Sequence, residues 1–139
     1  MSIIDSRLEL SSAQALTASA DATNVVDLTQ TARQVGAGKD LYVHFNVTVA
    51  ADFTTTDETY QFNIATGAAA TLGTVINSRI ITAGVLVAGF NFSMTIPSSE
   101  VLRYIGVEYV LGGTTPTVTM DAYISDQEAY SWTSTADAI

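Results

Sequence analysis

Apolar and polar residues alternate with a period of two along much of the chain, and this period predicts β-strands. The alternation is clearest in five segments, which are residues 41–49, 60–64, 90–96, 103–111 and 118–124. In the first of them every second residue from Leu41 to Val49 is apolar, so one face of the predicted strand is buried. Weaker alternation marks three further candidate strands, at residues 14–17, 24–28 and 75–81.

The segments between these strands are rich in Gly, Pro, Ser, Thr and Asp, which are the residues that form turns. The clearest turns are predicted at residues 36–40, 54–58, 97–99 and 112–116. Helical periodicity is weak throughout, so the helices that a parallel α/β fold needs are missing. About eight strands with turns between them predict an all-β fold, either a sandwich or a barrel.

The length of 139 residues fits one domain, which we expect to span residues 1–125. Residues 1–12 form either a first edge strand or an arm. From residue 126 to 139 no period is evident, and Ser, Thr, Ala and Asp surround Tyr130 and Trp132. We expect a C-terminal tail, or an arm that docks these aromatic side chains on a neighbour.

The composition favours a surface with few charges. Charged residues make up 14% of the chain, whereas a typical globular protein has about 25%. Hydroxyl groups take their place, since the sequence contains 20 threonines, and threonine prefers an extended backbone. Because removing such a surface from water costs little free energy, it suits a protein that lies against another protein.

The net charge of −9 excludes several partners. The five basic residues are scattered along the chain, so we expect no binding to nucleic acid or to an anionic membrane. Cysteine is absent, which rules out disulfides and thiolate metal sites. The N-terminus lacks the pattern of a signal peptide, and we expect synthesis in a cytoplasm.

A catalytic centre is not recognisable in the sequence. His44 is the only histidine and lies on the polar face of its predicted strand, and no Gly-x-Ser-x-Gly motif accompanies it. We therefore expect a surface or subunit-contact histidine, no catalytic residue and no cofactor. An enzyme remains an alternative only if His44 and a carboxylate share a pocket.

Acidic residues and aromatic residues are the remaining candidates for a binding site. Asp57 and Glu58 lie in a Thr-rich turn, where acids are normally solvated. A calcium site is conceivable from Asp121, Asp126 and Glu128, but no EF-hand pattern supports it and we expect no metal. A glycan-binding module of a tail fibre or spike is the alternative function, carried by aromatic residues that could line a sugar-binding face: Tyr104, Tyr109, Tyr123, Tyr130 and Trp132.

Several short patterns, in order, resemble one protein family. They run from Ile3-Ile4-Asp5 through residues 12–18, 23–28, 35–38 and 41–43. They are clearest in Ile96-Pro97, Leu102-Arg-Tyr-Ile-Gly-Val-Glu-Tyr109, residues 112–114 and Val118-Thr-Met-Asp-Ala122. In this series the chain resembles the capsid cement (decoration) proteins of short-tailed bacteriophages, of the Bordetella-phage type. Residues 50–89 and the tail after residue 126 match poorly.

The resemblance implies a jelly-roll subunit that binds the outside of a tailed-phage head. Such subunits associate with one another, with a dimer favoured, and clamp neighbouring major capsid proteins after the shell expands. The expected location is the outer surface of the virion, where a negative charge does not oppose packaged DNA. Our predicted partner contacts are Ile3, Ile4, Arg103, Tyr130 and Trp132.

Overall fold

The computed structural model describes residues 5–29 and 39–126, and the regular structure of these residues is almost entirely strand. The strands are β1 (Glu9–Leu16), β2 (Ala20–Asp21), β3 (Val26–Asp27), β4 (Tyr42–Val49), β5 (Thr59–Gly67), β6 (Thr74–Ile81), β7 (Asn91–Thr95), β8 (Tyr104–Gly112) and β9 (Val118–Ser125). Two short 3-10 helices join them, η1 (Ala83–Val85) and η2 (Ser98–Glu100). The predicted all-β fold is confirmed.

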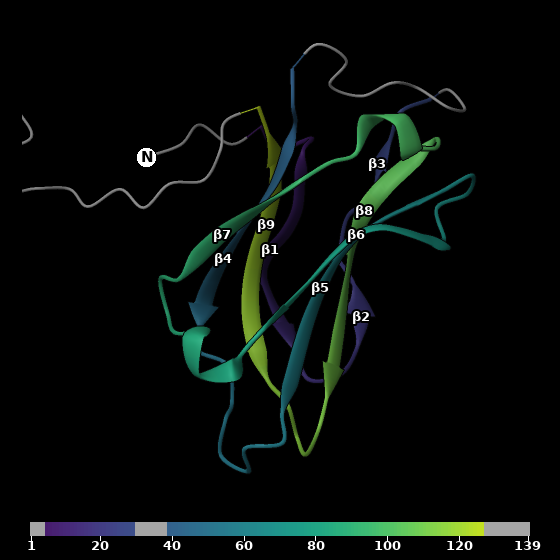
Figure 1. Cartoon of the computed structure of the whole chain (residues 1–139). Helices are drawn as coiled ribbons and strands as arrows, with labels where there is room; N and C mark the ends of the chain where they lie inside the picture. Colours follow the sequence, from purple (N-terminus) through teal and green to yellow (C-terminus); the bar gives the residue numbers. More distant parts are fainter. Residues whose placement is uncertain (1–4, 30–38, 127–139) are drawn as a thin grey trace, which may run out of the picture.

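The strands form two antiparallel sheets that pack face to face (Figure 1). One sheet has the order β1-β9-β4-β7, and the other has the order β2-β8-β5-β6 with β3 also paired to β8. Because β2 and β3 pair with successive parts of β8, they act as one interrupted strand. Counted so, the eight strands have the orders 1-8-3-6 and 2-7-4-5, which is the topology of a jelly roll.

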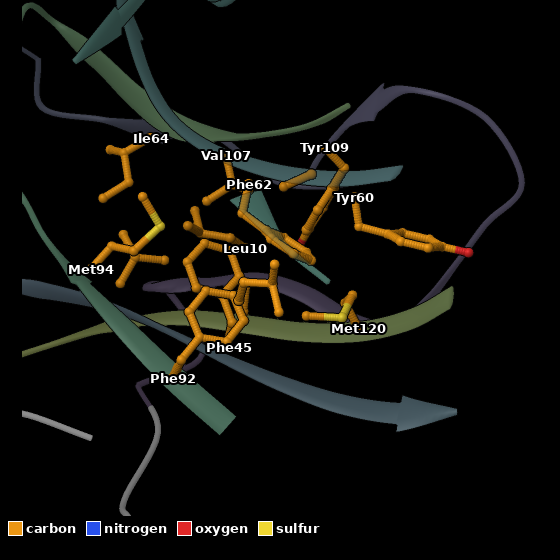
Figure 2. Packing of buried hydrophobic residues seen from close by; sticks show 14 of the residues in the cluster. Leu10, Phe45, Tyr60, Phe62, Ile64, Phe92, Met94, Val107, Tyr109 and Met120 are labelled. Carbon is orange, nitrogen blue, oxygen red and sulfur yellow. The ribbon is translucent and has the colours of Figure 1, made fainter. Parts of the chain in front are cut away.

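The core lies between the sheets and is built from every second residue of the long strands. Phe45 of β4 stacks on Phe92 of β7, with ring centroids 4.7 Å apart. Across the sandwich, Phe62 of β5 meets Phe92 edge to face at 5.1 Å. Within its own sheet, Phe62 also meets its cross-strand neighbour Tyr109 of β8 edge to face at 6.0 Å. Figure 2 shows these rings packed together with aliphatic and methionine side chains from both sheets.

Strand β1 is longer than the sequence predicts, because bulges interrupt its alternation. It begins at Glu9, whereas the period indicated a strand only from residue 14. Its pairing with β9 shifts register between Glu9 and Ser11 and again between Ser11 and Gln14, and Ala13 has a φ of 44°. An extra residue in a strand reverses the faces of those that follow, so the period of two is lost.

Loops form the two ends of the sandwich, which we call the tip and the base. At one end, the tip, lie residues 49–58, 82–90 and 112–117, which include η1 and the β4–β5 and β8–β9 connections. At the other end, the base, lie residues 5–8, 28–29, 39–41, 96–103 and 125–126. In Figure 1 the tip points down and the base lies at the top.

Candidate functional site

Arg103, the one predicted contact residue that the structure describes, lies at the base just before β8. Its Nε donates to Oδ1 of Asp27 at 2.9 Å, and a terminal nitrogen donates to Oδ2 at 3.0 Å. The guanidinium carbon also lies 5.1 Å from the ring centroid of Tyr104. Arg103 thus has an acidic partner within its own chain, and this bidentate pair joins the end of β3 to the start of β8.

The pair keeps both groups charged over a wide pH range. The hydrogen bonds from Arg103 lower the pKa of Asp27 from 3.8 to about 2, and the same carboxylate raises the pKa of Arg103. The two side chains are 41% and 38% exposed. A partner protein could therefore reach the ion pair, which presents a fixed and oriented charge distribution.

A pocket of about 280 Å³ opens beside this pair, at the base. Its wall is mostly apolar and its rim is acidic, with these lining residues: Asp5, Leu8, Val26, Leu28, Leu41, Ile105, Ile124, Ser125 and Asp126. Lys39 donates to Asp126 at 2.9 Å and so ties the start of the β4 segment to the end of β9. This ion pair lowers the pKa of Asp126.

The remaining predicted contact residues, Ile3, Ile4, Tyr130 and Trp132, lie outside the described residues. Asp5 and Asp126, which adjoin these stretches in the chain, line the same pocket. The described residues at both ends of the domain therefore lie at the base.

His44, expected as a surface or subunit-contact histidine, is buried within its own chain and is not a surface residue. Its side chain is on the outward face of β4 but only 7% exposed. The ring stacks on Tyr123 of β9 at 5.0 Å, with an angle of 5° between the planes, because the antiparallel register places the two residues opposite each other. In this arrangement His44 belongs to the packing of a sheet face.

The acidic residues are bound mainly by neighbouring donors. Asp57 accepts hydrogen bonds from Thr55 and Thr114, which lower its pKa. Asp121 accepts the Ala13 amide at 2.6 Å, and Asp126 pairs with Lys39, while Glu128 is outside the described residues. Across residues 5–29 and 39–126, no three His, Asp or Glu side chains are grouped as a metal site.

The described aromatic residues that suggested a sugar-binding face do not gather on one surface. Tyr109 is in the core, where its hydroxyl contacts Ser11 Oγ at 2.9 Å. Tyr123 lies on the outer face of one sheet beneath His44, and Tyr104 lies in the other sheet beneath Arg103. The part of the chain described here contains no helix long and apolar enough to cross a bilayer.

The comparison with known families covers nearly the whole sandwich. Residues 10–124 match the Bbp16 family model, from within β1 to within β9. The chain belongs to the Bbp16 family. This family name points to a Bordetella phage protein, which is compatible with a phage structural protein, and it states no function. No curated protein matches the sequence.

The Bbp16 range includes Arg103, Asp27 and His44, whereas Ile3, Ile4, Tyr130 and Trp132 lie beyond it. It also includes a group of exposed apolar side chains at the tip, which the sequence analysis missed. Their only signal in the sequence is the apolar run Val85-Leu86-Val87, which lies between two strands and fits neither.

Proposed function

We propose that this Bbp16 family protein is a capsid cement protein. It binds the outside of a tailed-phage head, clamps neighbouring major capsid proteins and stabilises the mature shell. It acts by contact alone, without a cofactor or a chemical step, and it associates with further copies of itself, most simply as a dimer.

The observation that carries this proposal is the family match over residues 10–124, in a chain whose strands follow the jelly-roll order. The family name points to a phage protein, and jelly rolls are a recurrent architecture of viral shell proteins. The segments that resemble cement proteins, 102–109 and 118–122, fall in and beside β8 and β9, at the centre of each sheet.

The surface of the second sheet suits such a role. Gln61 donates to Asn63 at 2.9 Å and to Ser78 at 2.8 Å, and Asn63 donates to Glu108 at 3.1 Å. These side chains hydrogen-bond to one another across β5, β6 and β8, so few polar groups on this face lack a hydrogen-bond partner. A surface of this kind loses little on being covered by another protein.

Stabilisation would follow from mass action. A protein that binds the expanded shell and not its precursor lowers the free energy of the expanded state alone. Contacts from the base would come from Arg103 and from the arms that carry Ile3, Ile4, Tyr130 and Trp132, since the described residues next to these stretches in the chain lie there. The location on the outer surface of the virion is part of this proposal, as is synthesis in the host cytoplasm.

The test compares heads with and without the protein. Heads assembled without it are heated or moved to low salt and are scored for rupture by negative-stain microscopy. We expect these heads to rupture at lower temperature than complete heads, and adding the purified protein back should restore them. Unexpanded heads given the same protein are the control and should not gain stability. Protein-free heads as robust as complete ones would overturn the proposal.

A further inference from the structure

The tip of the sandwich carries a group of exposed apolar side chains. Val49, Phe53, Val85 and Val87 are 44% to 59% exposed. Val49 ends β4 and Phe53 lies in the β4–β5 connection, while Val85 and Val87 lie in the connection that contains η1. Large apolar residues in loops gain nothing from exposure to water, so their grouping points to a contact surface.

These side chains lie on neighbouring segments, because main-chain hydrogen bonds hold the two segments together. Gly89 donates to Val47 at 2.8 Å and Ala51 donates to Leu86 at 2.9 Å, which sets the segment around Val49 beside the segment around Val87. The Phe53 ring lies next to Gly84, where an added Cβ would be only 3.9 Å from the ring. Val85 follows Gly84 directly, so Phe53 and Val85 belong to the same surface.

The structure holds Phe53 in its exposed position through the residue before it. The Asp52 amide donates to the Thr117 carbonyl at 2.8 Å, and the Asp52 carbonyl accepts the hydroxyl of the buried Tyr60 at 2.8 Å. The Asp52 carboxylate accepts the amide of Thr54 at 3.1 Å. A side chain presented by a fixed loop loses little conformational entropy on binding, as in the aromatic anchors of protein interfaces.

The negative charge of the tip indicates which kind of partner surface it would bind. Asp52 and the exposed Asp57 lie in the same loop as Phe53, whereas Glu58 is buried. Residues 49–58, 82–90 and 112–117 contain no Lys, Arg or His. Hydrogen bonds from Thr55 and Thr114 lower the pKa of Asp57, which keeps it ionised. Two tips facing each other would repel, whereas a surface with basic groups around an apolar hollow is complementary.

We propose that the tip is a docking surface for a protein with an apolar hollow flanked by Lys or Arg, and that Phe53 is its anchor. This inference rests on the proposed function, under which the partner is the major capsid protein. It gives the subunit a second contact surface, at the opposite end from Arg103, and a clamp between two neighbours needs two such surfaces.

The experiment measures how tightly the purified protein binds expanded heads that lack it. The variants are Phe53→Ser and Val87→Ser at the tip, with Ile80→Ser as the control, because Ile80 is 72% exposed on the edge strand β6 and outside the tip loops. Interface anchors typically lose about tenfold or more in affinity when truncated. We expect that loss for Phe53→Ser, a smaller one for Val87→Ser and less than twofold for Ile80→Ser. Thermal unfolding of each variant verifies that the fold is intact.

A second arm of the experiment tests the charge argument. Asp52→Asn keeps the oxygen that accepts the Thr54 amide and removes one charge from the tip. We expect weaker binding to heads and a shallower dependence on salt, while Asp21→Asn, an exposed residue of β2, should leave both unchanged.

The outcomes separate the two proposals. If the unaltered protein binds and stabilises heads but Phe53→Ser and Asp52→Asn bind equally well, the tip inference is overturned and the cement function stands. If the unaltered protein does not bind expanded heads at all, the proposed function fails and the tip inference fails with it.

Discussion

The base and the tip of this sandwich are built on the same two sheets and yet differ in chemistry. The base has oppositely charged pairs, Arg103 with Asp27 and Lys39 with Asp126, around an apolar pocket. The tip has exposed valines and Phe53 beside Asp52 and Asp57, and its loops at residues 49–58, 82–90 and 112–117 contain no basic residue. The difference shows that the strands set the framework, whereas the loops decide which partner each end can meet.

The two ends also depend on different interactions. The pairs at the base are exposed to solvent, and ion pairs of this kind contribute little to the stability of a fold. The tip is held by main-chain bonds and by the buried hydroxyl of Tyr60. Substitutions at the base should therefore affect recognition more than folding, while those within the tip loops affect both.

The largest effect should appear when both ends are changed together. Phe53→Ser at the tip and Arg103→Gln at the base lie at opposite poles, so their effects on head binding should be independent. We expect the double variant to lose affinity by the product of the two single losses, well over tenfold in all. Binding titrations on protein-free expanded heads measure this. A double variant no weaker than Phe53→Ser would mean that the base makes no contact of its own.

The next effect concerns the backbone of the tip. Gly113 has a φ of +91°, and an added Cβ would lie 2.4 Å from the Asp57 carbonyl oxygen. Gly113→Ala should cost about 3 kcal/mol of unfolding free energy, from strain and overlap combined. Gly89 has a similar φ of +88° but open space around it, so Gly89→Ala should cost about 1 kcal/mol. Denaturant unfolding distinguishes them, and equal losses would show that the close approach to Asp57 is unimportant.

The sandwich could be predicted because apolar and polar residues alternate over most of the length of its central strands, and the one register shift between β4 and β9 comes at the end of β4. The segment predicted at residues 41–49 is observed as Tyr42–Val49, and the one at 118–124 as Val118–Ser125. The alternation is weaker in β1 and β6, where the pairing with β9 and with β5 shifts register. The sequence therefore predicted β1 only in part and β6 only weakly. Local sequence does not encode a bulge, because it is fixed by the partner strand.

The surfaces could be predicted much less well. His44 was placed on the correct face of its strand, but its burial depends on Tyr123, which is 79 positions later in the chain and aligned by register. The Asp27 partner of Arg103 and the patch around Phe53 likewise arise from segments far apart in sequence. The contacts assigned to Ile3, Ile4, Tyr130 and Trp132 stay predictions.

A smaller effect on stability is expected from the hydroxyl that supports the tip. In Tyr60→Phe the Asp52 carbonyl and the Thr117 amide lose their shared partner, which should cost about 1–2 kcal/mol. Hydrogen exchange should be faster at the Thr117 amide. Tyr109→Phe is the matched control, since its hydroxyl contacts Ser11, which keeps a bond to Gln14. Faster exchange at Thr117 in both variants would count against a specific role for Tyr60.

The smallest effect belongs to the ion pair at the base, and it is visible mainly as a pH dependence. The folded pKa of Asp27 is about 2, below the value of 3.8 for a free side chain. Folding therefore favours the ionised form, and the pair stabilises the fold above pH 3.8 but loses this contribution as the pH falls to about 2. Asp27→Asn should be slightly less stable than the unaltered protein near neutral pH, and the two should converge in acid.

Arg103→Gln should give the same profile, and the double variant should be no less stable than either single variant. A difference that persists undiminished from neutral pH to pH 2 would show that Asp27 acts through packing and not through its charge.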